Sequence, residues 1–299
     1  MGAADKKRIL IADDQEALRS LLSRMLLREG FEPIEASDGE QAIELYRSLS
    51  PSLVISDIMM PKMDGLTLLT EIKKIDPSTA VILMTGHGNE DILLKALQGG
   101  ATNFFKKPFN VRGLIREIYK IFQYKVEEVK SYFYSPYLVS ETKEFVLTTG
   151  NPQYHPIVNQ ITLQLPCLLA DSEILNLKIG IEEMLTNAIE HGNLGISFME
   201  KKAAIEKGKL GELFADRLRA GGNADKRVCI SSTLTSELFT VKIRDEGGGF
   251  DWRNLPELLP ENLFSYSGRG IFLTKIYFDE LVYNESGNEV TLLKKKKRL

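Results

Sequence analysis

Residues 181–193 read IEEMLTNAIEHGN, and this stretch decides how the second half of the 299-residue chain folds. Apolar residues in it and just before it recur at the spacing of one buried helical face: Leu177, Ile181, Met184, Leu185 and Ala188. Glu183 and Asn187 stand four residues apart, so they project together from another face of the same helix. We expect Gly192 to end the helix.

The pair Glu183 and Asn187 has two interpretations. A carboxylate beside a carboxamide on a packed helix suits a site for Mg²⁺ and phosphate oxygens, because the amide oxygen can ligate the cation and the carboxylate can orient or deprotonate an attacking group. The alternative is an ordinary amphipathic helix whose polar residues meet water. The decision between them rests on two glycine-rich turns downstream.

The two turns are DEGGGF at residues 245–250 and GRG at residues 268–270. The glycines of the first turn allow the backbone to approach a planar base closely, and Asp245 can accept a hydrogen bond from an exocyclic amine such as that of adenine. The second turn opens a predicted helix, so it offers bare N–H groups and the helix dipole to phosphates. Each turn alone is common, but the two turns together with the helix are a strong signal for a site that holds a base, phosphates and a cation.

Composition sets the outer limits. Lys and Arg number 38 against 41 Asp and Glu, a net charge of -3, which gives no electrostatic reason to expect nucleic acid or an anionic membrane as a partner. The N-terminus MGAADKKR lacks the apolar core of a signal peptide, and we expect a cytoplasmic protein. Cys167 and Cys229 stand in apolar runs and are interpreted as core residues rather than as a disulfide or metal site.

The first domain is predicted to span residues 1–122, where apolar runs alternate with helical patterns. Strands are expected at residues 9–12, 33–36, 53–56, 81–84 and 103–105. Helices are expected at residues 16–28, 40–48, 65–74 and 89–98, with another beginning near Val111. This alternation predicts an α/β fold with a doubly wound, five-stranded parallel sheet, in which the ligand site lies at the carboxyl ends of the strands.

Polar residues follow these strands closely: Asp13, Asp14, Asp57, Thr85 and Lys107. Three carboxylates in one crevice repel one another unless a cation neutralises them, and oxygen ligands favour Mg²⁺. A lysine and a threonine hydroxyl beside them can contact phosphoryl oxygens. The chemistry indicated is attack of a carboxylate on phosphorus to give an aspartyl phosphate. A single aspartate in this position is usually a helix cap, but caps do not account for all five residues together.

With these residues, the first domain resembles the response-regulator receiver family over residues 7–122. The motifs LIADD, SDIMMPKMDG and KKPF carry the resemblance. It implies that Asp57 is the phospho-acceptor served by an upstream histidine kinase, and that the Met59 carbonyl completes the Mg²⁺ shell. It also implies that Thr85 and Phe104 form a switch that responds to the phosphoryl group.

Residues 123–143 are interpreted as a helical and aromatic linker. Apolar residues at alternating steps of four and three form a seam along the helix that leads into it: Val111, Ile115, Ile118, Phe122, Val126 and Val129. The seam is compatible with a homodimer through residues 111–129 and equally with a long helix that packs on the second domain. The pattern does not separate these two.

The second domain is predicted at residues 144–299 as an α+β domain with mostly antiparallel strands. Its expected order is a strand at 144–149, a helix at 156–165, the helix ending at His191, strands at 227–234 and 238–245, a helix from Gly268 to about Phe278, and two final strands. A charged, helical insertion at about 196–220 follows the helix that carries Glu183 and Asn187.

This domain resembles the Bergerat ATP-binding fold shared by gyrase, sensor histidine kinases and anti-sigma factor kinases. The resemblance implies Asn187 as the Mg²⁺ ligand, Glu183 as the catalytic base and Asp245 as the residue that reads adenine. The ATP-binding set it implies is Asn187, Asp245, Gly247, Gly249, Gly268, Arg269 and Gly270.

Within that superfamily, EEMLTNAIEHGN, RDEGGGFDW and GRGIF are most similar to the anti-sigma serine kinase branch. The similarity implies a serine/threonine kinase that phosphorylates an antagonist protein and binds a sigma factor. The alternative is a domain that binds ATP but only scaffolds its partners. A histidine kinase hybrid is disfavoured, because the chain has three histidines and His155, near the place of a phospho-acceptor, is followed by Pro156.

Overall fold

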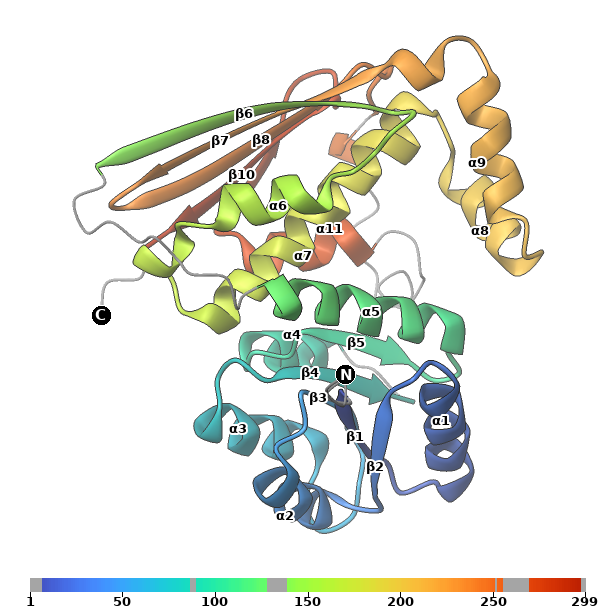
Figure 1. The fold of residues 1–299 in the computed structure, drawn as a ribbon, viewed down its shortest axis with the longest axis vertical. Coiled ribbons are helices and arrows are strands. Elements are labelled where there is room, and N and C mark those ends of the chain that lie inside the picture. Colours follow the sequence, from blue (N-terminus) through green and yellow to red (C-terminus); the bar gives the residue numbers. More distant parts are fainter. Residues whose placement is uncertain (1–6, 87–89, 128–138, 251, 255–268, 297–299) are drawn as a thin grey trace, which may run out of the picture. The chain divides into compact units, whose positions relative to one another are not determined.

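The computed structural model describes residues 7–86, 90–127, 139–250, 252–254 and 269–296. The chain divides into two compact units, residues 1–125 and residues 126–299 (Figure 1). None of the helices in the described ranges combines the length and the apolar character that a bilayer crossing requires.

The first unit is built on a five-stranded parallel sheet in the order β2-β1-β3-β4-β5. Its strands are β1 Arg8–Ala12, β2 Glu32–Ala36, β3 Leu53–Asp57, β4 Ala80–Thr85 and β5 Asn103–Lys106. The strands β3 and β4 are buried along their whole length. Helices cover both faces of such a sheet, which is why its central strands are continuous apolar runs in the sequence. The predicted doubly wound sheet is confirmed.

Helices follow the strands of the first unit at the predicted places. They are α1 Glu16–Arg28, α2 Gly39–Leu49, α3 Gly65–Ile75, α4 Glu90–Gln98 and α5 Val111–Glu127. Two of them begin at an aspartate whose side chain accepts a first-turn N–H, since Asp38 caps α2 and Asp64 caps α3. The cap on α3 fixes the end of the loop that follows Asp57.

One residue of the apolar seam of α5, Phe122, packs against other residues of the first unit. Its ring stacks on Phe31 with the centroids 5.3 Å apart, and the Lys7 ammonium lies 4.8 Å from the centre of the Phe122 ring. The side chain of Val126 and the whole of Val129 lie outside the described residues, as does most of the predicted linker. Dimerisation through this helix, and its packing on the second domain, both stay predictions.

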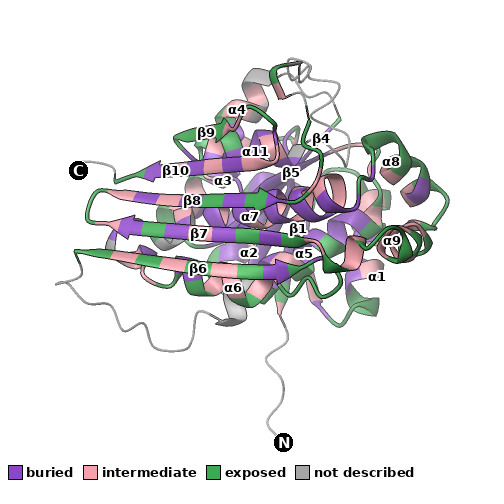
Figure 2. Ribbon diagram, turned by 90° about the horizontal axis from the view of Figure 1, so that it is seen from above, coloured by how far each residue is buried: buried purple, intermediate pink, exposed green. Residues whose placement is uncertain are grey.

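The second unit is built on a five-stranded sheet in the order β6-β7-β8-β10-β9, with antiparallel neighbours throughout. Its strands are β6 Ser140–Thr148, β7 Arg227–Thr235, β8 Leu238–Asp245, β9 Glu280–Tyr283 and β10 Glu289–Lys295. Burial alternates along β7 and β8 (Figure 2), because one face of this sheet is covered and the other is open. The predicted α+β arrangement is confirmed, although β6 begins four residues before the predicted start at Glu144.

Helices α6 His155–Thr162, α7 Asp171–Asn187 and α11 Arg269–Tyr277 lie on the covered face (Figure 1). The predicted insertion forms two helices, α8 Phe198–Glu206 and α9 Leu210–Arg219. Short 3₁₀ turns complete the unit: η1 Leu165–Cys167, η3 Asn223–Asp225 and η4 Trp252–Asn254. A capping box starts α8, because the Ser197 side chain and the Glu200 side chain each accept the other residue's backbone N–H.

The prediction that Gly192 ends the helix of Asn187 is wrong. The helix continues beyond Asn187 as a π-helix, η2 Ala188–Asn193, which contains Gly192. Glycine is needed there for another reason, since a Cβ at this position would lie 2.5 Å from Oδ1 of Asp245. Wide π turns occur frequently at functional sites, and this one brings the end of the helix against the end of β8.

The interpretation of Cys229 as a core residue is also wrong, because Cys229 is an exposed free cysteine. It stands between Val228 and Ile230, which are both buried. Successive side chains of a strand point to opposite faces, so in a sheet with one covered face the middle residue of an apolar run faces outward. The side chain of Cys167 lies outside the described residues.

Candidate functional site in each unit

Three carboxylates lie together at the carboxyl end of the parallel sheet. Asp13 follows β1 and Asp57 ends β3, and both are buried, whereas Asp14 is exposed. One oxygen from each of the three lies within 4.8 Å of the others. The structure therefore brings together the carboxylates predicted to bind Mg²⁺, and three oxygen ligands at this spacing fit a hard divalent cation.

Lys107, which follows β5, lies directly on this cluster. Its Nζ donates to Oδ2 of Asp13 at 2.6 Å and to Oδ2 of Asp57 at 2.7 Å. Burial raises the pKa of the Asp57 carboxyl above its ordinary value, and the hydrogen bond and charge of Lys107 oppose that rise. Burial also acts to lower the pKa of Lys107, but its bonds to the two aspartates outweigh this and raise it. The site thus holds a charged lysine next to the predicted acceptor.

The other predicted residues of the first unit lie on β4, on β5 and in the loop after β3. Thr85 ends β4 and is buried, and its hydroxyl oxygen has no hydrogen-bond partner among the described residues. Such a buried hydroxyl is available to a phosphoryl oxygen. Phe104 is buried on β5. The backbone of Met59 lies beside the acceptor, with its N–H 3.5 Å from Oδ1 of Asp57 and its side chain exposed.

Gly65 explains why the acceptor loop ends in glycine. A Cβ at this position would lie 2.1 Å from the Asp57 carbonyl oxygen. The Gly65 N–H donates to the carbonyl of Ile58 at 2.9 Å. The start of α3 therefore packs directly on the backbone of the acceptor and holds it in place.

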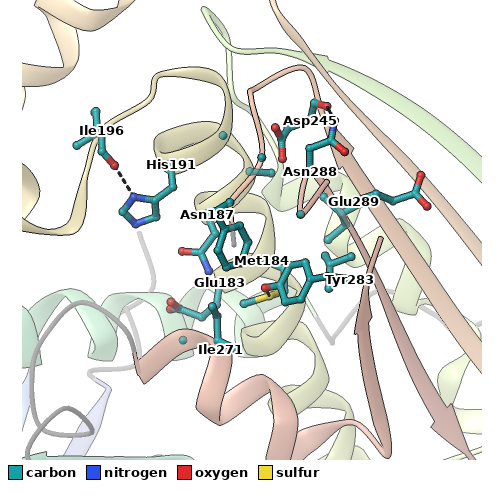
Figure 3. Close-up of a pocket in the computed structure, with 18 of the residues that line it drawn as sticks. Glu183, Met184, Asn187, His191, Ile196, Asp245, Ile271, Tyr283, Asn288 and Glu289 are labelled. Atoms are coloured by element: carbon teal, nitrogen blue, oxygen red, sulfur yellow. Dashed lines mark hydrogen bonds between the residues drawn. The ribbon is translucent and has the colours of Figure 1, made fainter. Parts of the chain in front are cut away.

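The second unit contains a pocket of about 470 Å³ on the covered side of its sheet (Figure 3). Elements that are distant in sequence form its walls: α7, η2, α8, β8, α11, β9 and β10. Five of the predicted ATP-site residues line it: Glu183, Asn187, Asp245, Gly249 and Gly270. Gly268 and the side chain of Arg269 lie outside the described residues.

Glu183 and Asn187 face the pocket from α7, as their spacing predicts (Figure 3). A Cβ on Gly270 would lie 2.5 Å from Oε2 of Glu183. Glycine at the start of α11 therefore lets that helix approach the Glu183 carboxylate closely. The N-terminus of α11, the carboxylate and the carboxamide share one end of the site, an arrangement that suits phosphate and a cation.

Asp245 ends β8 on the opposite side of the pocket from α11 (Figure 3). Its carboxylate accepts the Gly247 N–H at 2.8 Å. Burial raises the pKa of Asp245 to about 6, while the Gly247 N–H and the charge of Lys226 act to lower it. A buried acceptor of this kind can receive a hydrogen bond from an exocyclic amine.

The glycines after Asp245 are required by contacts within the chain. A Cβ on Gly247 would lie 2.2 Å from the Gly192 carbonyl oxygen, and one on Gly249 would lie 1.9 Å from the Ser286 carbonyl oxygen. Gly249 also has a φ of +74°, which favours glycine. These glycines were predicted to let a base approach, whereas the described contacts that require them are between backbone segments.

Two asparagines of this site were missed from the sequence. Asn193 is buried and donates to Thr149 Oγ1 at 2.8 Å, while its Oδ1 accepts the Glu246 N–H at 2.8 Å. Asn288 donates from Nδ2 to the Asp245 carbonyl at 3.3 Å. Asn288 therefore holds the backbone of Asp245 directly, and Asn193 holds the backbone of the next residue, Glu246. A signal for Asn193 existed, since it closes the stretch IEEMLTNAIEHGN, but its partners are far away in sequence.

Two aromatic residues of the pocket wall were also missed. Phe250 and Tyr283 both line the pocket, and their ring centroids lie 5.1 Å apart in an edge-to-face arrangement. Burial raises the pKa of the Tyr283 hydroxyl above its ordinary value, with a smaller contribution from the charge of Asp245. These rings give the pocket an apolar wall on the side of Asp245, which suits a planar base.

Comparison with known proteins matches a family to each unit. Residues 9–119 match the response regulator receiver domain, and residues 157–294 match the histidine kinase-like ATPase domain. The chemotaxis protein CheY of Bacillus subtilis (strain 168) is 42% identical over 114 residues, which are 38% of this chain and 95% of that protein. The sporulation initiation phosphotransferase F of the same organism is 37% identical and covers 35% of this chain and 85% of that protein.

A solved CheY-like receiver domain structure from Methanospirillum hungatei JF-1 covers 42% of this chain and 99% of that chain, with 29% identity and a TM-score of 0.41. Each of these relatives corresponds in length to one domain.

Proposed function

This chain belongs to the response-regulator receiver family and also carries a histidine kinase-like ATPase domain, and from this premise we propose that phosphorylation of Asp57 controls an ATP-binding output domain. One observation carries the proposal for the receiver. Lys107 contacts Asp13 and Asp57 together, and this lysine cation against the buried carboxylate proposed as the acceptor supports phosphoryl transfer to Asp57.

In the proposed reaction, an Asp57 carboxylate oxygen attacks the phosphorus of an upstream phosphohistidine, and the bond from phosphorus to the histidine nitrogen breaks. Lys107 contacts a phosphoryl oxygen as a point charge, and the Thr85 hydroxyl donates to another. Asp13, Asp14, Asp57 and the Met59 carbonyl would hold Mg²⁺, which supplies charge neutralisation when it is bound.

One observation carries the proposal for the second unit. Asn187 and Glu183 from α7, Asp245 from β8 and Gly270 from α11 line a single pocket. We infer that adenine lies at Asp245 beside Phe250 and Tyr283, and that the phosphates lie near Asn187 and the start of α11. Asn187 would hold Mg²⁺ through its amide oxygen.

We further propose that the output domain is a serine/threonine kinase of the anti-sigma type. A serine hydroxyl of an antagonist protein attacks the γ-phosphorus, the bond from this phosphorus to the bridging oxygen of ADP breaks, and the proton passes to the Glu183 carboxylate. The position of Glu183 in the pocket wall supports this role. A sigma factor and its antagonist are the proposed partners.

The test uses the full chain, labelled ATP and candidate antagonist proteins. We expect label on serine or threonine of an antagonist, and we expect Glu183→Gln to abolish the label while calorimetry still detects ATP binding. The matched control is Glu173→Gln, on the same helix but outside the pocket. ATP binding without transfer to any candidate would favour the scaffold alternative.

A further inference from the structure

The helical insertion of the second unit forms one wall of the nucleotide pocket. Ser197, Phe198 and Lys201 from the start of this insertion line the pocket beside Asn187. Phe198 adds an apolar side chain to this wall and is 38% exposed. The insertion is therefore part of the site and not only a surface appendage.

The start of the insertion is tied to the π-helix η2 on both sides of Ile196. The Ile196 N–H donates to the Glu190 carbonyl at 2.9 Å, and its carbonyl oxygen lies 2.5 Å from Nδ1 of His191 (Figure 3). The capping box of Ser197 and Glu200 then sets the direction of α8. These ties place Lys201, on the first turn of α8, at a defined position in the wall.

The Lys201 ammonium forms an ion pair with Glu190 of η2. Both side chains are largely withdrawn from solvent, with 16% of Lys201 and 13% of Glu190 exposed. An ion pair this far from water is costly to break unless another charge replaces the lost one. Lys201 lines the pocket whereas Glu190 does not, so an anion in the pocket is such a replacement.

The charge of the pocket gives Lys201 a specific role. Among the described residues that line it, Lys201 is the one lysine or arginine, against the carboxylates Glu183, Asp245 and Glu289. A triphosphate with a single Mg²⁺ still carries net negative charge, and charge-assisted hydrogen bonds from lysine are a strong way to hold it. The described pocket otherwise presents acidic, neutral and apolar groups.

We propose that Lys201 is a further nucleotide-binding residue, whose ammonium contacts the phosphate chain of the bound nucleotide, and that Glu190 is the anion that holds it while the pocket is empty. The proposal rests on the proposed ATP binding of this unit. It makes the insertion a determinant of how well the pocket distinguishes nucleotides from nucleosides.

The test is calorimetry on the full chain with ATP, ADP and adenosine, each with Mg²⁺. We expect Lys201→Gln to weaken ATP about tenfold or more, the size of one lost charge-assisted hydrogen bond, and to leave adenosine within about twofold. The control Lys202→Gln removes the same charge from the next residue, which is exposed and outside the pocket, so it leaves all three affinities unchanged.

A second variant separates binding from packing. We expect Glu190→Gln to strengthen ATP, because no carboxylate then competes with the phosphates for Lys201. A purely structural ion pair predicts the reverse, since either substitution would then damage the pocket and weaken ATP and adenosine alike. The double variant Glu190→Gln with Lys201→Gln leaves no unpaired buried charge, and it still loses ATP affinity relative to Glu190→Gln if the proposal holds.

The outcomes are distinguishable. A wild-type chain that binds neither ATP nor adenosine overturns the proposed function, and this inference with it. A wild-type chain that binds ATP, together with a Lys201→Gln variant that binds it equally well, overturns the inference alone. Equal losses for ATP and adenosine in a variant with the wild-type melting temperature also overturn it.

Discussion

The two candidate sites differ in what lies against their buried carboxylates. In the first unit, Asp13 and Asp57 both accept hydrogen bonds from Lys107 at 2.6 and 2.7 Å. Asp57 of the first unit is 4% exposed and Asp245 of the second unit is 8% exposed, so the two are similarly buried. Yet among the described residues Asp245 forms no ion pair, and its side chain accepts the N–H of Gly247.

The difference shows what each carboxylate is suited to do. A lysine in contact favours the ionised form of Asp57, which is the form that attacks phosphorus. Burial raises the pKa of both carboxyls, but at Asp57 the hydrogen bond and charge of Lys107 oppose the rise. Asp245 has no such lysine contact among the described residues and its pKa is raised to about 6, so this carboxyl suits a hydrogen bond to a neutral amine. We therefore propose covalent chemistry for the first site and recognition of a base for the second.

The largest expected effect is at Asp57. We expect Asp57→Asn to abolish phosphorylation by acetyl phosphate in Mg²⁺, because the amide cannot attack phosphorus. The measurement is acid-labile, hydroxylamine-sensitive label on the full chain. The control is Glu44→Gln, which removes the charge of an exposed residue on α2. We expect this variant to keep wild-type labelling. Equal labelling of Asp57→Asn would break the assignment of the first site to covalent chemistry.

Asn187→Ala is expected to remove the Mg²⁺ dependence of ATP binding, because the variant lacks the amide oxygen proposed as the ligand. Titrations with and without Mg²⁺ measure the effect, and we expect a difference of about tenfold or more in the wild type to vanish. Asn176→Ala lies on the same helix outside the pocket and keeps the difference. Unchanged Mg²⁺ dependence in Asn187→Ala would contradict the proposed cation site.

Thr85→Ala tests whether the first site acts on the second. The proposed switch is movement of Thr85 toward the phosphoryl group, with Phe104 following. Helix α5, Val111–Glu127, comes after these residues in the chain and precedes the second unit. Beryllofluoride, an analogue of the phosphoryl group, is expected to change nucleotide affinity or antagonist phosphorylation five- to hundred-fold in the wild type, a coupling of about 1–3 kcal/mol.

In Thr85→Ala this response is expected to disappear while Asp57 labelling and ATP binding persist. Thr70→Ala, exposed on α3, keeps the response and serves as the control. No response in the wild type would mean that the receiver does not act on the ATP site, and dimerisation or partner docking would become the better account.

The smallest expected effect sharpens the contrast between Asp57 and Asp245 through stability. The pKa of Asp245 is raised in the folded state from 3.8 to about 6, so the folded chain holds a proton that the unfolded chain loses. The resulting stability is present below about pH 4 and is lost as the pH rises to about 6, by at most about 3 kcal/mol.

The side chain in the Asp245→Asn variant is uncharged at every pH, so the variant does not lose stability when the pH rises. We compare the melting temperature of the second unit in the variant with that in the wild type. The variant is expected to gain a few degrees over the wild type between pH 4 and 6, and the difference then stays constant at higher pH. The same variant is expected to weaken adenine nucleotides more than guanine nucleotides. A difference in melting temperature that does not vary with pH would show that burial does not raise the pKa of Asp245.

Much of the first site could be predicted because parallel topology leaves few alternatives. Continuous apolar runs identify β3 and β4 as buried strands, and the carboxyl ends of parallel strands lie at one edge. Asp13 follows β1, Asp57 ends β3 and Lys107 follows β5. Residues at these strand ends are therefore neighbours in space as soon as the strands are recognised. The pair Glu183 and Asn187 was predictable for a similar local reason, the helical repeat.

Sequence by itself determined the fold class of both units and most residues of the two sites, because strand and helix periodicity and strand-end position are local properties. Only the tertiary structure decided what packs against those residues. Gly192 is a glycine because Asp245 approaches it from β8, Cys229 is exposed because its sheet has one open face, and Lys201 reaches the pocket because α8 lies against η2. These facts depend on contacts between segments that are distant along the chain, and no local pattern encodes such contacts.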